Sequence, residues 1–181
     1  ILVNIGVLGI FKYFNFFIDS FIDLVSLSGY DLPRSTLKII LPVGISFYTF
    51  LSLSYIIDIR KKSLNANRNI IDVLLSLSFF PIILAGPIQR PASLLPQISQ
   101  KRKFDYNQAV DGLKQILWGL FTKVVIADNL AIYVDDFFLN YSNYGGSTLL
   151  LGAIFYTVQI YADFSGYSDM AIGTGKLFGF N

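Results

Sequence analysis

The sequence contains no cysteine and no histidine among its 181 residues, and charged residues make up only 14%. The absence of cysteine excludes disulfides, cysteine–metal sites and thiol nucleophiles. The absence of histidine removes the commonest general base and metal ligand, so we expect neither a metal site nor a histidine-based catalytic centre in this chain. A net charge of +2 gives no indication of a nucleic-acid partner.

Apolar residues dominate what is present. They make up 54% of the chain, and the mean hydropathy is +0.57. An ordinary soluble domain has roughly 25% charged residues, so this composition predicts an all-α, polytopic membrane helical bundle in contact with lipid. The chain begins inside an apolar run at Ile1 and ends at Asn181 without a polar tail. We therefore expect it to be one part, a partial domain, of a longer protein.

The hydrophobic pattern divides the chain into helical segments. Residues 1–27 are expected to hold the end of a span followed by an interfacial helix, because Lys12 and Tyr13 resemble a headgroup boundary. The other predicted segments are a transmembrane helix over 37–59, a helix over 105–133 opened by a capping box at Asp105 and Gln108, and a polar-rich membrane helix over 147–176.

Two basic loops flank residues 69–88. The first loop contains Arg60, Lys61, Lys62 and Arg68 without an acid, and the second, over 89–104, contains Arg90, Lys101, Arg102 and Lys103. Basic loops favour the cytoplasmic side, so a full crossing between them conflicts with the charge rule. Pro81, Gly86 and Pro87 can break a helix, and we therefore interpret 69–88 as a re-entrant or broken segment and 89–104 as a cytoplasmic loop.

The stretch from Gln159 to Phe180 places two carboxylates, Asp163 and Asp169, in an otherwise apolar helix. Helical spacing puts Gln159, Asp163 and Tyr167 on one face, and Gly166 and Gly173 would let a neighbouring helix or a ligand approach the backbone. The acids could bond to neighbouring helices and hold the bundle together, or line a polar cavity. A transporter with an ion or proton site and a non-catalytic scaffold also fit this pattern. The cation of Lys123 is expected to extend to the headgroups.

Three ordered motifs carry a family resemblance. They are LPVGISFYTFLSLSYIIDIRK (41–61), FFPIILAGPIQRP (79–91) and YADFSGYSDMAIGTGKLFGF (161–180). Together they closely resemble the membrane-bound O-acyltransferase family, especially its bacterial alginate O-acetyltransferase-like branch, with the D-alanyl transfer branch more distant. The resemblance implies a multi-pass protein of the bacterial cytoplasmic membrane. It would transfer an acyl group, expected to be acetyl, from a cytoplasmic donor or carrier to hydroxyls of an exported polysaccharide such as alginate.

The resemblance also implies a donor, partners and site positions. The donor would be acetyl-CoA or an acyl-carrier thioester, with no bound cofactor, and the partners would be envelope proteins of polysaccharide modification. The family's catalytic histidine would lie beyond Asn181, so no catalytic residue can be assigned here. The candidate cavity-lining residues are Gln159, from its helical spacing, and the motif positions Pro87, Gln89, Arg90, Tyr161, Asp163, Ser165, Gly166, Tyr167, Ser168 and Asp169.

The re-entrant interpretation predicts that both basic loops lie on the same side of the membrane. Because this chain has no native cysteine, Lys62→Cys and Gln100→Cys each add one thiol to it. We expect a membrane-impermeant maleimide to label both positions from the same side of sealed vesicles. Labelling from opposite sides would contradict the re-entrant segment.

Overall fold

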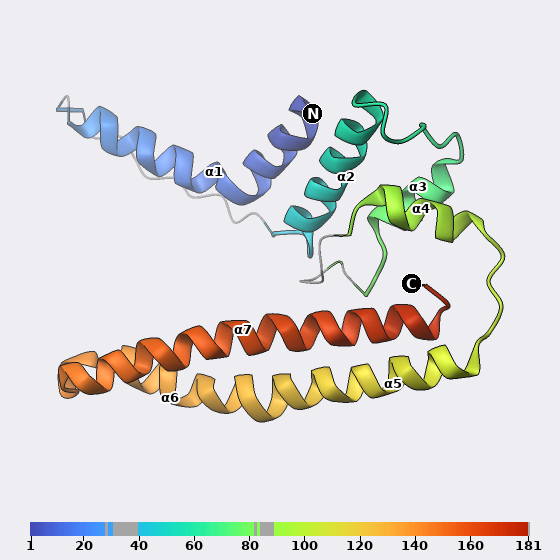
Figure 1. The fold of residues 1–181 in the computed structure, drawn as a ribbon. Helices are drawn as coiled ribbons and strands as arrows, with labels where there is room; N and C mark the ends of the chain where they lie inside the picture. The colour runs from blue at the N-terminus through green and yellow to red at the C-terminus, as the bar shows by residue number, and fades with distance from the viewer. Residues whose placement is uncertain (28, 31–39, 82, 84–88, 181) are drawn as a thin grey trace. The chain divides into compact units, whose positions relative to one another are not determined.

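The structure is a computed structural model that describes residues 1–27, 29–30, 40–81, 83 and 89–180. Within these ranges it is helical and contains no strand, which confirms the all-α prediction. The helices (Figure 1) are α1 (Leu2–Ser26), α2 (Ile45–Arg60), α3 (Ile70–Leu77), α4 (Pro91–Ser99), α5 (Tyr106–Phe121), the π-helix η1 (Thr122–Ala127), α6 (Asp128–Leu139), the 3-10 helix η2 (Tyr141–Asn143) and α7 (Gly146–Leu177). They form two compact units, Ile1–Ser78 with Gln89–Pro96, and Phe79–Ile88 with Gln97–Asn181.

In the first unit, α1 and α2 pack as an antiparallel pair. The Asn4 amide donates to Ser52 Oγ at 2.8 Å, and the Lys12 ammonium donates to Ser46 Oγ at 3.3 Å. The sequence predicted an interface near Lys12 that would separate a span from an interfacial helix. The structure has one helix over these residues, because no proline interrupts them and one lysine does not end a helix, and the position of the membrane interface along it stays a prediction.

The helix predicted over residues 37–59 begins later, at Ile45. Gly44, the residue before it, has φ 74°, a left-handed conformation that glycine adopts without strain. The 16 residues of α2 are roughly 24 Å long at ~1.5 Å per residue, less than the ~30 Å hydrocarbon core. Residues 37–39 lie outside the described residues, so a transmembrane role for 37–59 stays a prediction.

The predicted re-entrant segment over 69–88 is described in part. It opens with the two-turn helix α3, whose N-terminus is capped by the Asn69 side chain, which accepts from the Ile71 N–H at 3.0 Å. The helix ends before Pro81. Gly86 and Pro87 lie outside the described residues, so the break that they would cause stays a prediction.

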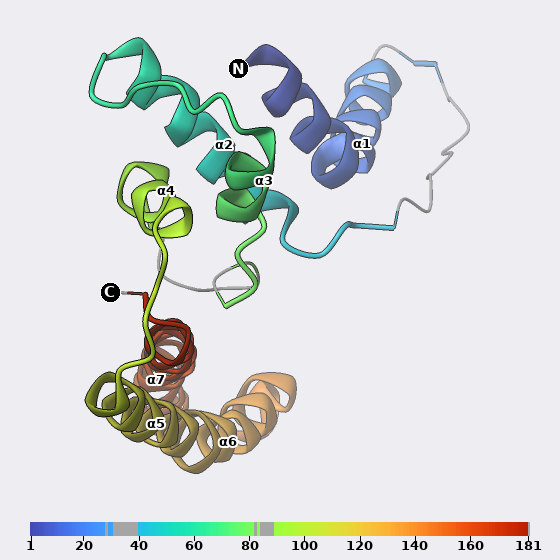
Figure 2. The same cartoon turned by 90° about the vertical axis from the view of Figure 1, so that its right-hand side faces the viewer.

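The second unit is built on a long helical hairpin, residues 106–177. The helices α5, η1 and α6 run without interruption from Tyr106 to Leu139, six residues past the predicted end, and α7 returns antiparallel beside them (Figures 1 and 2). The predicted cap is confirmed, since the Asp105 side chain accepts from the Gln108 N–H at 3.1 Å. At the opposite end, the Tyr144 hydroxyl donates to the Asp136 carboxylate, and this hydrogen bond raises the pKa of Tyr144.

Four glycines bring the two helices of the hairpin into backbone contact. A Cβ added to Gly119 would lie 2.5 Å from the Gly166 carbonyl oxygen, and one added to Gly173 would lie 2.5 Å from the Gly112 carbonyl oxygen. Both distances are shorter than real Cβ contacts, so only glycine fits. The expected approach at Gly166 and Gly173 is therefore confirmed, and its occupant is the α5 backbone.

The C-terminal end of α7 closes with a Schellman motif. Gly179 has φ 74°, the Phe180 N–H bonds to the Gly175 carbonyl at 3.0 Å, and the Gly179 N–H bonds to the Lys176 carbonyl at 3.0 Å. The turn buries the Phe180 ring, and the Gln108 amide donates to the Phe180 carbonyl at 3.0 Å. The start of α5 is thereby attached to the end of α7.

Replacing Gly119 by alanine should destabilise the hairpin. The new Cβ would meet backbone atoms that cannot move independently, which costs about 1–3 kcal/mol by overpacking, against a gain of about 1 kcal/mol in helix propensity. Thermal unfolding of the intact protein in detergent should therefore show a lower Tm. The matched control is Gly146→Ala, where a Cβ meets no atom within 4 Å and where we expect no loss.

Candidate functional site

Lys123 lies between two carboxylates near the midpoint of the long hairpin. Its ammonium is 2.6 Å from Asp163 Oδ1 on α7 and 2.6 Å from Asp128 Oδ1 on its own helix. We call these three residues the Lys123 cluster. Two carboxylates and one ammonium give it a formal charge of −1. A carboxylate on each side holds the ammonium of Lys123, and its expected extension to the headgroups stays a prediction.

The cluster lies far from both ends of the hairpin. Lys123 is 17 positions after Tyr106, or roughly 26 Å along the helix at ~1.5 Å per residue. Its side chain is 37% exposed and that of Asp163 is 54% exposed, so the cluster opens on the outside of the helix pair. Charged groups in the middle of an apolar segment usually face protein or water, and they are pathway or functional-site candidates.

The π-helix brings Asp128 next to Lys123. A π-turn pairs residues i and i+5, and the Asp128 N–H bonds to the Lys123 carbonyl in this register. Two carbonyls at the turn, those of Val124 and Val125, accept hydrogen bonds from the Asn129 side chain at 3.1 and 2.9 Å. Single π-turns inside α-helices occur frequently at functional sites, which is consistent with the position of the cluster.

Asp169, the second predicted acid, lies nearer the C-terminal end of α7 and bonds to α5. The Gln115 amide donates to Asp169 Oδ1 at 3.0 Å, while Gln115 Oε1 is buried without a hydrogen-bond partner among the described residues. The Ser168 hydroxyl and Gln159 Oε1 are also buried without a hydrogen-bond partner among the described residues. Buried unpaired polar atoms are rare, so they mark places where water, a ligand or further protein can bind.

The remaining candidate residues have varied positions. On α7, Tyr161 is exposed, Ser165 and Tyr167 are half-buried, and Gly166 is buried against α5. Gln89 and Arg90 belong to the first unit, where the Arg90 carbonyl accepts from the Ser93 N–H at the start of α4. Pro87 lies outside the described residues. The two acids of α7 therefore lie in the second unit, on the long hairpin, whereas Gln89 and Arg90 belong to the first unit.

The start of the second motif packs on the end of the third. The rings of Phe79 and Phe180 lie 4.8 Å apart edge to face, and those of Phe80 and Phe178 lie 5.7 Å apart in the same arrangement. These four aromatic residues connect two stretches that are separated by about a hundred residues in the sequence. The start of the second motif and the end of the third thus meet inside the second unit.

Sequence reasoning missed Lys123, Gln115 and the glycines of α5 as partners of α7. Lys123 is a cation in an apolar run, and the same kind of signal, a charge in an apolar run, singles out Asp163. Gly112 and Gly119 repeat the seven-residue spacing of Gly166 and Gly173, and that shared spacing could have paired the two helices. Nothing in the sequence indicates the π-turn that brings Asp128 to Lys123.

Three helices in the described part of the chain are long and apolar enough to cross a membrane: α1, the continuous helix Tyr106–Leu139, and α7. Together with the relatives described next, they identify a multi-pass membrane protein. No protein-family model and no solved structure matches the chain.

Curated relatives match between 76% and 99% of the chain. A probable alginate O-acetylase of Pseudomonas aeruginosa is 42% identical over 180 residues, which is 99% of this chain and 34% of the relative. A peptidoglycan O-acetyltransferase of Helicobacter pylori is 33% identical over 98% of this chain and 38% of the relative. A teichoic acid D-alanyltransferase of Bacillus subtilis is 24% identical over 76% of this chain and 35% of the relative.

The chain spans about a third of the length of the curated relatives it matches. Their names are those of enzymes that transfer an acetyl or a D-alanyl group, and they refer to alginate, peptidoglycan and teichoic acid. The chain is thus homologous to about a third of each of these proteins. This similarity supports the membrane-bound O-acyltransferase-like family that its three motifs predicted.

The shared ammonium predicts an order of mutational effects in the Lys123 cluster. Lys123→Gln leaves two neighbouring carboxylates without a countercharge, whereas Asp163→Asn leaves the Lys123–Asp128 pair. We expect Lys123→Gln to lower the Tm of the intact protein more than Asp163→Asn, and adding Asp163→Asn to Lys123→Gln to restore part of the loss. Asp135→Asn on α6 is the charge-matched control. Equal and additive effects of the two single variants would contradict the shared-ammonium arrangement.

Proposed function

We propose that the chain is part of a membrane enzyme that transfers an acyl group, specifically acetyl, to hydroxyls of an exported polysaccharide. The observation that carries this proposal is the 42% identity to a probable alginate O-acetylase over 99% of the chain. The relative from Helicobacter pylori supports the same chemistry on another envelope polymer. Alginate is one acceptor of this class, and the common element is a sugar hydroxyl.

The donor would be a thioester, either acetyl-CoA or an acylated carrier, on the cytoplasmic side. In the transfer, a hydroxyl oxygen of the acceptor attacks the thioester carbonyl, the C–S bond breaks, and the sulfur leaves as a thiol after taking up a proton. A general base must remove the hydroxyl proton, and histidine is suited to this step by its near-neutral pKa. This chain has no histidine, so the base that the resemblance implies is not among its 181 residues.

This chain would contribute a polar wall to the site. The Lys123 cluster opens outward from the hairpin, and its charges are stable in a membrane only against protein or water. We infer that this face lines a hydrated passage shared with the rest of the protein. Asp163 is then oriented by Lys123, and Asp169 by Gln115, so that both carboxylates present fixed acceptors to hydroxyl groups.

The location and partners follow from the same proposal. A thioester donor made in the cytoplasm and an exported acceptor would place the enzyme in the bacterial cytoplasmic membrane. Further envelope proteins would carry the acyl group onward to, or position, the polymer. The candidate residues Gln89 and Arg90 would meet the donor at the basic loop, where a guanidinium can bind phosphate or carboxylate groups by charge-assisted hydrogen bonds.

The test is the ester-linked acetate on the cell's exported polysaccharide. Deleting the gene should remove alkali-labile acetate, and the intact gene should restore it. Asp169→Asn keeps the shape of the side chain but removes the carboxylate that Gln115 orients, so we expect roughly tenfold or greater loss of acetylation at normal protein levels in the membrane. Asp135→Asn is the control and should retain acetylation.

Unchanged acetate after gene deletion would reject the acyltransferase proposal. A pH-dependent ion flux through the reconstituted protein that Asp163→Asn abolishes would favour a transporter instead. Full acetylation by Asp169→Asn would leave the acyltransferase class intact and reject the assigned role of Asp169.

A further inference from the structure

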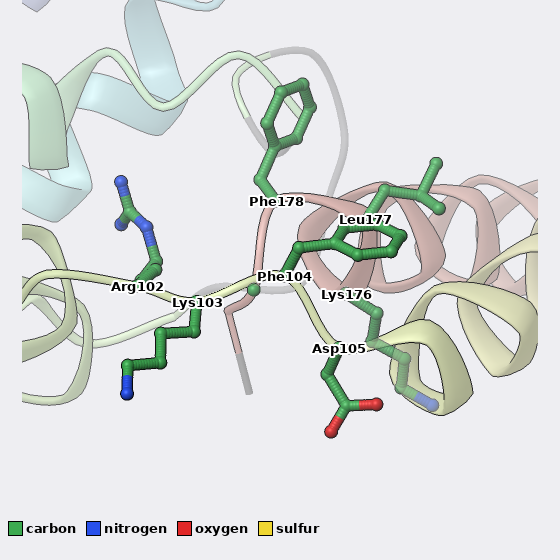
Figure 3. Close-up of a pocket in the computed structure, with 8 residues that line it drawn as sticks. Arg102, Lys103, Phe104, Asp105, Lys176, Leu177 and Phe178 are labelled. Atoms are coloured by element: carbon green, nitrogen blue, oxygen red, sulfur yellow. The ribbon is translucent and has the colours of Figure 1, made fainter.

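A pocket lies at the open end of the long hairpin, where α5 begins and α7 ends. It has a volume of about 250 Å³ and is lined by eight residues, Arg102 to Asp105 and Lys176 to Gly179 (Figure 3). All of them belong to the second unit. The pocket lies far along the hairpin from the Lys123 cluster, so it is separate from the site proposed above.

The lining of the pocket includes both charged and apolar side chains. Figure 3 shows the side chains of Arg102 and Lys103 projecting to opposite sides of the chain trace, and the ring of Phe104 lying next to Leu177. The lining of the pocket therefore combines the cations of Arg102 and Lys103 with the apolar side chains of Phe104 and Leu177. Such a combination fits a molecule with a phosphate attached to a hydrocarbon chain.

The guanidinium of Arg102 is held in place by the protein. It lies 4.1 Å from the centre of the buried Phe180 ring, and it donates one N–H to the Gln97 carbonyl at 3.1 Å. Arginine has five N–H donors, so donors remain for an anion. The Schellman turn at Gly179 fixes the Phe180 ring, and a Cβ at Gly179 would contact the Arg102 side chain at 3.5 Å.

The other charged residues of the pocket are largely committed elsewhere. The Asp105 carboxylate caps α5 through the Gln108 N–H, and the Lys176 ammonium pairs with Asp111. Lys103 has no ion pair within the residues that the structure describes. The pocket consequently presents the positive charges of Arg102 and Lys103 with no carboxylate bound to either.

The depth of the pocket in the membrane favours a lipid. The continuous helix Tyr106–Leu139 is roughly 51 Å long at ~1.5 Å per residue, and the hydrocarbon core is only ~30 Å thick. The end of the hairpin therefore reaches the headgroup region. Phe104, Tyr106 and Phe178 are exposed there, as expected for aromatic side chains at a membrane–water interface.

We propose that this pocket binds the phosphate of an anionic phospholipid, with Arg102 and Lys103 on the phosphate and with Phe104, Leu177 and Phe178 against the start of the acyl chains. The inference goes beyond acyl transfer, and it holds whether or not the protein is an enzyme. Bound lipid would tie the first turn of α5 to the last turn of α7 at the membrane surface.

The experiment uses the purified, delipidated intact protein in neutral detergent. Phosphatidylglycerol or phosphatidylcholine is added, and binding is read from the Tm and from lipid retained in native mass spectra. We expect phosphatidylglycerol to raise the Tm more than phosphatidylcholine. Lys103→Gln should weaken phosphatidylglycerol binding roughly tenfold, as for the loss of one charge-assisted hydrogen bond.

Lys101→Gln provides the matched control. It removes the same charge two residues before Lys103, and the Lys101 side chain does not line the pocket. Arg102→Gln also removes contacts to Phe180 and Gln97, so Lys103→Gln keeps the test decisive if the arginine variant is unstable. Equal loss in Lys101→Gln and Lys103→Gln would show a general surface-charge effect and overturn the site.

A final arm separates lipid from soluble phosphate. Inorganic phosphate and pyrophosphate, added without lipid at matched ionic strength, should neither raise the Tm nor displace phosphatidylglycerol. Suppose instead that phosphate or pyrophosphate displaces the lipid, and that the Lys103→Gln variant no longer binds this soluble ligand. The pocket is then a site for soluble phosphate, and the lipid assignment is wrong.

Discussion

The backbone contact between α5 and α7 is the constraint on which the rest of the second unit depends. Gly119 on one helix meets Gly166 on the other, and Gly112 meets Gly173. At this separation there is no room for side chains between the helices, so the polar residues flanking the glycines project along the edges of the contact. In a membrane, where water does not drive helices together, such close packing of small residues supplies much of the association energy.

The same contact decides which polar groups can meet. Asp163 and Asp169 lie on either side of Gly166 in the sequence, and each reaches one residue of the opposite helix, Lys123 and Gln115 respectively. The choice left open by the sequence, between acids that bind neighbouring helices and acids that line a polar cavity, is therefore not exclusive. Both acids bond to the neighbouring helix, and the exposed half of Asp163 remains available to a cavity.

The sequence predicted the helical class, the cap at Asp105 and the closeness of Gly166 and Gly173 to a neighbouring helix. It did so because these features depend on local composition and spacing. It failed where the outcome depends on non-local register, since no spacing rule places Lys123 opposite Asp163 or Gln115 opposite Asp169. The late start of α2 reflects the left-handed backbone conformation of Gly44, which the amino-acid sequence alone does not specify. The lining of a cavity by the candidate residues stays a prediction.

The π-helix η1 also determines which residues of the long helix face α7. The buried positions Gly112, Gly119, Ala127 and Val134 are spaced by seven, eight and seven residues, and the interval of eight contains the π-turn. One extra residue would rotate the following α-helical turns by about 100°, and the wider turn absorbs that rotation. Natural relatives that lack one residue here could keep the same face by reverting to a regular α-helix. Length variation within this helix should therefore concentrate at residues 122–127, at the cost of the pairing between Lys123 and Asp128.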